Sequence, residues 1–223
     1  MLDKNNLEKI SAELEIHHAV LIAVSKTKPI SEIKEAYDCG QRDFGENYVQ
    51  ELQEKYLQLP KDICWHFIGH LQTNKVKLIA PFISLIQSVD SLKLLEEINK
   101  ESKKNNRVID CLLQIHIAEE ETKSGLSFEE CKLLLNSEKI KAFQNIIVKG
   151  LMGMATLTEN QNKIRKEFKN LKSFFDSVKA GIPYLPFEIL SIGMTSDYHI
   201  ALEEGSNMVR IGSLLFGERN YNK

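Results

Sequence analysis

The chain has 223 residues, a formal net charge of −2 at pH 7, and apolar and charged fractions of 43% and 27%. These values are those of an ordinary globular protein, so we expect one domain spanning residues 1–223. The interspersed charges exclude the basic footprint of a nucleic-acid-binding protein, and no signal peptide or window of membrane-spanning length is present, which argues against a membrane partner.

The cysteine and histidine patterns predict no metal site. His66 and His70 lie four residues apart but straddle an expected strand end without an HExxH motif, so we expect them to form hydrogen bonds. No CxxC pair occurs among the four cysteines, which are Cys39, Cys64, Cys111 and Cys131. Isolated thiols are typical of a reducing compartment, and we therefore expect a cytoplasmic protein.

Short apolar runs alternate with longer amphipathic segments along the chain, after an amphipathic helix that opens at the N-terminus. The runs predict eight strands, at Val20–Ser25, Asp43–Gly45, Trp65–Gly69, Leu85–Ser88, Asp110–Ile117, Ile146–Leu151, Phe187–Ser191 and Met208–Ile211. The segments between them predict helices at Ser31–Cys39, Tyr48–Leu59, Asn74–Ala80, Ser91–Asn105, Ser127–Leu135, Glu159–Lys179 and Asp197–Glu204. Eight alternating units favour an α/β fold closed into a (β/α)8 barrel of the TIM type, with an open doubly wound sheet as the alternative. Ser31, Ser91 and Ser127 are expected N-caps.

The first expected strand leads into Lys26. Side chains alternate along a strand, so Ile22, Val24 and Lys26 share one face. If Val24 points into the barrel, Lys26 lies at its upper rim, where burial would favour the neutral amine that attacks carbonyl groups. The alternative is a lysine that extends into solvent at a strand end, and this segment alone favours that alternative.

The turns after expected strands seven and eight predict a phosphate site. Barrels frequently bind phosphate there through exposed backbone N–H groups and a helix N-terminus. Gly193 and Gly212 permit close backbone approach, and Thr195, Ser196 and Ser213 carry hydroxyl groups. Helix capping by Ser196 or Asp197 is the alternative for either turn alone.

Arg210 connects these two features. Strand eight of a closed barrel pairs with strand one, so Arg210 and Lys26 are expected to be neighbours at the rim. A buried arginine needs an acceptor, which an ordinary salt bridge or a cofactor could supply. A lysine, an arginine and a phosphate cradle together suggest pyridoxal 5′-phosphate (PLP), held as a Schiff base on the lysine.

The sequence also resembles a known family, the YggS/PROSC-type pyridoxal phosphate homeostasis proteins, whose fold is similar to the N-terminal barrel of alanine racemase. The resemblance covers about residues 20–221. The segments that carry it are AVSKTKP (Ala23–Pro29), FGENYVQE (Phe44–Glu51), WHFIGHLQTNK (Trp65–Lys75), SVDS (Ser88–Ser91), TKSGL (Thr122–Leu126), GLM (Gly150–Met152), SIGMTSD (Ser191–Asp197) and VRIGSLLFGERNY (Val209–Tyr221).

The resemblance implies roles for individual residues. Lys26 takes the position of the Schiff-base lysine, Arg210 faces the pyridine nitrogen, and Asn47 lies on a loop at the cofactor end. The phosphate-binding turns correspond to Ser191, Gly193, Met194, Thr195, Gly212 and Ser213. Lys123 matches a suspected second PLP acceptor, and Lys28 is close enough in sequence to assist. The segment Gly153–Ala155 departs from the usual pattern of the family.

These residues lead us to expect a protein that carries PLP and serves vitamin B6 homeostasis, without catalytic residues of its own. An arginine beside the pyridine nitrogen only donates hydrogen bonds, so it does not hold a proton on that nitrogen. The unprotonated ring is a weaker electron sink. The chain also ends shortly after strand eight, so we expect no C-terminal β-domain of the alanine racemase type, and a monomer that meets PLP-dependent apoenzymes transiently. The alternatives are a PLP-dependent amino-acid racemase and a barrel enzyme that acts on a phosphorylated metabolite without PLP.

Overall fold

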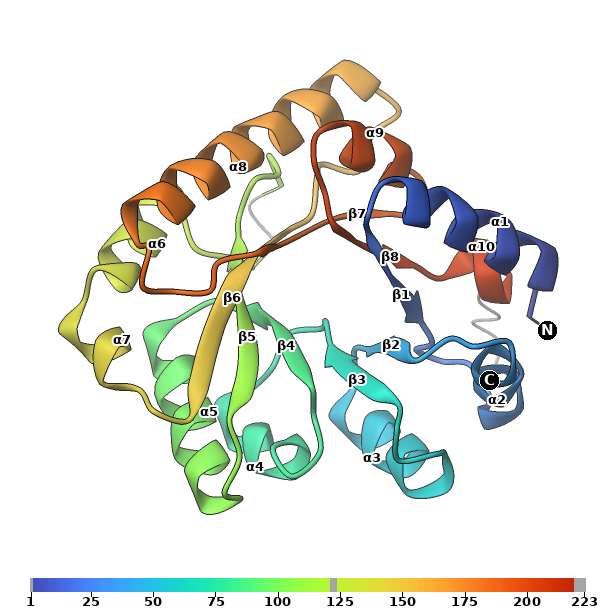
Figure 1. Cartoon of the computed structure of the whole chain (residues 1–223), viewed down its shortest axis with the longest axis horizontal. Helices are drawn as coiled ribbons and strands as arrows, with labels where there is room; N and C mark the ends of the chain where they lie inside the picture. Colours follow the sequence, from blue (N-terminus) through green and yellow to red (C-terminus); the bar gives the residue numbers. More distant parts are fainter. Residues whose placement is uncertain (1, 121–123, 219–223) are drawn as a thin grey trace.

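The protein folds into a closed barrel of eight parallel strands. The computed structural model describes residues 2–120 and 124–218. Each strand pairs with the next, and β8 returns to pair with β1, so the sheet has no free edge. Figure 1 shows the helices around the outside of this barrel. Closure confirms the predicted (β/α)8 fold and excludes the open sheet.

The strands and helices follow one another in the predicted order. The strands are β1 (Val20–Val24), β2 (Asp43–Glu46), β3 (Cys64–Phe67), β4 (Leu85–Val89), β5 (Ile109–Ile115), β6 (Ile146–Gly153), β7 (Ile189–Met194) and β8 (Met208–Ile211). The helices are α1 (Lys4–Ile16), α2 (Ile30–Asp38), α3 (Val49–Gln58), the 3-10 turn η1 (Thr73–Lys75), α4 (Val76–Ile79), α5 (Leu92–Lys104), α6 (Phe128–Leu135), α7 (Glu138–Ala142), α8 (Gln161–Gly181), α9 (Tyr198–Glu203) and α10 (Ser213–Phe216).

Alternation along the strands separates two apolar clusters. On β1, Leu21 and Ala23 join the large core that also includes the buried faces of the helices, whereas Ile22 belongs to a second cluster. That second cluster fills the barrel interior and consists of Ile22, Leu85, Leu112, Met152 and Met208. The interior is therefore packed with side chains, so a ligand is expected at an end of the barrel.

A bulge in β6 sets which of its residues face inward. Cys111 of β5 pairs with Val148, but Leu112 pairs with Gly150, so Lys149 is an extra residue on β6. Val148 and Leu151 pack in the outer core, while Met152 packs in the interior. Without the extra residue, strict alternation would point Met152 outward.

Two of the three predicted caps are confirmed and one is wrong. Ser91 accepts a hydrogen bond from the Leu94 N–H, and Ser127 forms a capping box with Glu130. Ser31 is already inside α2, which begins at Ile30 after Pro29 in the N-cap position without a side-chain cap. Pro29 has a φ of −68°, so it leads directly into the helix one residue early.

The N-terminal helix closes the outer layer beside the end of the barrel. The Asp3 N–H donates to the Leu215 carbonyl (2.7 Å), and the Asn6 amide donates to the Leu214 carbonyl (3.1 Å). Figure 1 accordingly shows α1 against α10, next to the β1–β8 pair. Within residues 2–120 and 124–218, no helix combines the length and apolar character needed to cross a bilayer.

Candidate functional site

The carboxyl ends of the strands enclose a cavity of about 330 Å³ that gathers most of the predicted site residues. Its lining consists of Val24, Lys26, Lys28, Asn47, Ile68, Met154, Met194, Thr195, Ser196, Arg210, Gly212, Ser213 and Gly217. The volume lies in the range of small-ligand pockets, roughly 300–1,000 Å³. The lining comes from both halves of the sequence, because closure of the barrel places β1 beside β8.

The inward face of β1 leads directly to Lys26. Ile22 packs inside the barrel, Val24 lines the cavity, and Lys26 follows on the same face at the rim. This placement agrees with the strand alternation read from the sequence. Thr27 follows with a φ of +64°, a left-handed conformation that is uncommon for a β-branched residue.

A buried ion cluster holds the backbone on both sides of Lys26. The Lys55 ammonium donates to the Ser25 carbonyl, to Glu46 Oε1 and to Glu51 Oε1, each at 2.7 Å. The Ser25 hydroxyl donates to Glu46 Oε1 (2.5 Å), and the Thr27 N–H donates to Glu51 Oε1 (2.6 Å). Glu46 is fully buried, and burial raises the pKa of its carboxyl group to about 7.

Arg210 lies at the base of the cavity, with only 3% of its surface exposed. One nitrogen, Nη1, donates to the Ser191 carbonyl (2.8 Å) and hydroxyl (2.6 Å), and Nη2 donates to the Gly153 carbonyl (2.9 Å). Burial lowers the pKa of the guanidinium to about 10, so Arg210 remains a cation at neutral pH. It can donate hydrogen bonds into the cavity but cannot take up a proton.

The turns after β7 and β8 are tied to each other across the mouth of the cavity. The Gly212 N–H donates to Thr195 Oγ1 (3.3 Å), and the Met194 N–H donates to the buried Asp197 carboxylate (2.6 Å). A Cβ on Gly212 would lie 3.2 Å from the Val24 carbonyl oxygen, so glycine lets this turn approach β1. The two turns therefore form one wall.

Two residues expected on the phosphate turns lie elsewhere. β7 extends to Met194, three residues beyond its predicted end, so Ser191 and Gly193 are strand residues outside the cavity lining. A register shift between Ser191 and Met194 lets β7 stay paired with β8, and Gly193 has a φ of +96°. Ser191 is fully buried beneath Arg210.

Two other lysines were singled out from the sequence, Lys28 and Lys123. The Lys28 ammonium donates to the carbonyls of Phe216 (2.6 Å), Gly217 (3.1 Å) and Glu218 (3.2 Å), so it holds the end of α10. Its position suits a structural contact more than direct assistance to Lys26. Lys123 lies outside the described residues.

Sequence reasoning missed the apolar wall of the cavity. Met154 lines this wall because the β6 bulge determines which way Met152 and the residues after it point. The prediction missed Met154 because the predicted strand ended at Leu151, too early. Ile68 follows β3 on the inward face, two residues after His66. Strand alternation could have identified Ile68, and Gly150 inside the β6 run was a signal for the bulge.

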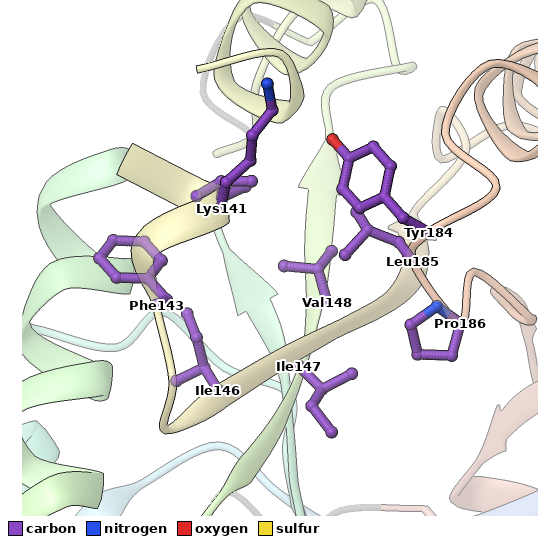
Figure 2. A pocket seen from close by; sticks show the side chains of 9 residues that line it. Lys141, Phe143, Ile146, Ile147, Val148, Tyr184, Leu185 and Pro186 are labelled. Atoms are coloured by element: carbon purple, nitrogen blue, oxygen red, sulfur yellow. The ribbon is translucent and has the colours of Figure 1, made fainter. Parts of the chain in front are cut away.

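A second hollow, of about 600 Å³, lies at the opposite ends of the strands and is a poorer candidate. Figure 2 shows its lining from the start of β6 and the segment before β7, including Val148, Tyr184 and Leu185. Apart from Lys141 and Tyr184 its side chains are apolar, so it lacks the converging polar groups of a ligand site. Nor does the part of the chain described here bring three His, Cys, Asp or Glu side chains together as metal ligands.

Comparison with known sequences gives a consistent result. Residues 4–220 match the family described as "Alanine racemase, N-terminal domain". A pyridoxal phosphate homeostasis protein of Aquifex aeolicus is 42% identical over 208 residues, covering 91% of this chain and 88% of its own. The protein of the same name from Haemophilus influenzae is 40% identical over 204 residues, covering 90% and 85%.

Solved structures agree with the sequence matches. PipY of Synechococcus elongatus PCC7942, in a form with PLP bound, is 32% identical with a TM-score of 0.88, covering 96% of this chain and 99% of its own. An alanine racemase from Bartonella henselae is 17% identical with a TM-score of 0.68, covering 96% of this chain and 59% of its own, which shows a shared fold. The barrel, the family match over residues 4–220 and relatives at about 40% identity place this chain in the family of the pyridoxal phosphate homeostasis proteins.

Proposed function

We propose that this protein binds PLP in the cavity at the carboxyl ends of the strands, as a Schiff base on Lys26, and carries the cofactor for vitamin B6 homeostasis. One observation carries the proposal: Lys26 and the buried cation Arg210 line the same cavity as the two tied turns after β7 and β8. The names of the relatives and the PLP-bound form of PipY support it.

The residues of the cavity fit the chemical groups of PLP. Thr195, Ser196 and Ser213 offer hydroxyl groups, and the turns offer backbone N–H groups, which suit a phosphate. Asn47 has a buried amide oxygen without a hydrogen-bond partner among the described residues, so this side chain can bond to a ligand. Val24, Ile68 and Met154 supply apolar surface for an aromatic ring.

The covalent step belongs to Lys26. Its neutral amine would hold PLP as an imine, in which the lysine nitrogen replaces the aldehyde oxygen and that oxygen leaves as water with the two amine hydrogens. The step reverses when water adds to the imine carbon, which suits a protein that both stores and releases the cofactor. Bound PLP would supply an electron-withdrawing ring.

Arg210 argues for carriage over turnover. Its guanidinium stays charged near neutral pH and cannot share a proton with the pyridine nitrogen as a carboxylate does. We propose that the protein acts in the cytoplasm as a monomer and hands PLP to apoenzymes transiently. Exchange of the α-proton of free amino acids into deuterated water at a useful rate would instead show a racemase-like enzyme.

Lys26→Ala and Lys26→Arg test the proposal. The purified protein should develop a visible absorption band with PLP, and borohydride should fix the cofactor on the peptide that contains Lys26. Both variants should lose the band and the adduct, because arginine keeps the charge but cannot form the imine. An adduct retained in Lys26→Ala would point to Lys123 or another lysine, and a wild-type protein that stays colourless would refute the proposal.

A further inference from the structure

A continuous row of hydrogen bonds crosses the barrel from Arg210 to Asp43. Arg210 Nη1 bonds to Ser191 Oγ (2.6 Å), and Ser191 Oγ bonds to Gln87 Oε1 (2.7 Å). Gln87 Nε2 bonds to His66 Nδ1 (3.1 Å), and His66 Nε2 bonds to Asp43 Oδ1 (2.9 Å). We call these five residues the interior chain.

The interior chain joins the two ends of the barrel. Arg210 lines the cavity at the carboxyl ends of the strands, whereas Asp43 is the first residue of β2, at the opposite end, with its side chain 32% exposed. The middle members come from β3, β4 and β7, and Ser191 and Gln87 are fully buried. They cross an interior that is otherwise filled by aliphatic and methionine side chains.

With the Gln87 amide nitrogen facing His66 and Met208 Sδ, one orientation of the donors satisfies every bond of the interior chain. A guanidinium only donates, so Ser191 Oγ accepts from Arg210 and gives its own proton to Gln87 Oε1. The Gln87 amide then presents its nitrogen to His66, whose Nδ1 must accept. The imidazole proton therefore sits on Nε2 and points to the Asp43 carboxylate, which only accepts.

This arrangement links a cation to an anion through three aligned neutral groups. Aligned hydrogen bonds polarise one another, so the carboxylate at one end strengthens the bond to the guanidinium at the other. The second amide hydrogen of Gln87 is also used, on Met208 Sδ (3.3 Å), which fixes the rotation of the amide. Apolar side chains in place of the whole row could fill the interior without any aligned polar groups, so the polar row calls for a functional explanation.

We propose that Gln87 and His66 are positioning residues for Arg210, and that Asp43 anchors the far end of the row as its anionic acceptor. Through Ser191 they fix the guanidinium at the base of the cavity, where it would be available to the ring of PLP. The carboxylate whose charge acts on the guanidinium is the buried Asp197. The inference rests on the proposed function, because its consequence for ligand binding requires PLP in the cavity. It predicts that a change at the far end of the barrel alters the cofactor site.

Three variants test the interior chain. Gln87→Leu breaks it at the centre, and Asp43→Asn removes the charge while keeping the shape of a partly exposed side chain. Leu85→Met is the matched control. Leu85 lies two residues before Gln87 on the inward face of β4, but it is not a member of the interior chain. Leucine and methionine have similar volumes, so this swap should keep the barrel interior packed.

Titration with PLP should show weaker binding in both test variants, by about three- to thirtyfold, with a shifted visible band. Leu85→Met should keep the wild-type affinity and band. The unloaded protein gives a separate readout: nitrogen-15 NMR should find the His66 proton on Nε2 in the wild type, with Nδ1 accepting a hydrogen bond. The Nδ1 resonance should shift in Gln87→Leu, because the donor to Nδ1 is gone while Asp43 still holds the Nε2 proton. Wild-type affinity and band in both test variants, or a His66 proton on Nδ1, would overturn the inference. Absence of any PLP band in the wild type would refute the proposed function. The NMR result would then test by itself whether the hydrogen bonds of the interior chain are formed.

Discussion

At the scale of single residues, the chemistry of Lys26 depends on neighbours that never enter the cavity. Thr27 holds a left-handed backbone conformation, which costs of the order of 1–3 kcal/mol for a non-glycine residue. The Glu46–Lys55–Glu51 ion cluster holds the peptide groups on both sides, through the Ser25 carbonyl and the Thr27 N–H. The lysine therefore stands on a backbone that is fixed before any ligand arrives.

Glu46 should make the stability of the protein depend on pH. Burial raises the pKa of its carboxyl group from 4.5 to about 7, so the folded state binds a proton more tightly than the unfolded state. The stability that this proton contributes is complete below about pH 4.5 and is lost as the pH rises through about 7. Glu46→Gln keeps the shape without the titration. The free energy of unfolding of the wild type, minus that of Glu46→Gln, should fall by about 1–3 kcal/mol across this window in urea titrations.

The exposed Glu54, on the same helix α3, provides the control for this experiment. Glu54→Gln removes the same type of charge from the surface, and the difference in unfolding free energy between it and the wild type should stay flat over the window. A difference for Glu46→Gln that rises with pH would show that the carboxylate, held by Lys55, is the form that the fold prefers.

At the scale of elements, glycine decides how β6 meets its neighbours. Gly150 has a φ of +153°, and a Cβ there would lie 1.8 Å from the Ile189 carbonyl oxygen of β7. The bulge therefore needs glycine for both its conformation and its close packing. Because the bulge turns Met152 inward and precedes Met154, it shapes the interior cluster and one wall of the cavity.

Gly150→Ala should consequently destabilise the protein by at least about 3 kcal/mol, since backbone must move against backbone. Gly181→Ala is the matched control, because Gly181 ends α8 and a Cβ there meets nothing within 4 Å. Alanine at this helical position should leave stability unchanged or raise it by up to about 1 kcal/mol. Urea unfolding of both variants measures the contrast, and equal stabilities would contradict the importance of the bulge.

At the scale of the whole molecule, the sequence predicted the order of the strands, and with it the site. Once eight parallel strands close, β1 lies beside β8, so the cavity that Lys26 and Arg210 share followed from topology. The expectation that the two lie side by side at the rim was wrong, because the register pairs Arg210 with Ile22, four residues before Lys26. The ends of the strands were less predictable. β7 continues to Met194, beyond its predicted end at Ser191, through a register shift against β8 that no local turn signal in the sequence marks. The interior chain was also hidden, since Gln87, His66 and Ser191 are isolated polar residues on three strands and become a row only in the folded barrel.

Ligand binding should stabilise the whole barrel, because the residues that line the cavity lie on, or directly after, the first three strands and the last three. A ligand that binds only the folded state adds about 2.7 kcal/mol at a concentration one hundred times its dissociation constant. For a chain of this size, PLP should then raise the midpoint of thermal unfolding by roughly 5–10 °C, as measured by calorimetry.

Two controls separate the contributions to this shift. Pyridoxine 5′-phosphate keeps the ring and the phosphate but has an alcohol in place of the aldehyde, so it should give a smaller shift in the wild type through non-covalent contacts alone. Lys26→Ala cannot form the imine, and PLP and pyridoxine 5′-phosphate should therefore stabilise it equally. If PLP still stabilised Lys26→Ala as much as the wild type, the turns and Arg210 would account for the whole binding energy, and the covalent bond would serve only to retain the cofactor.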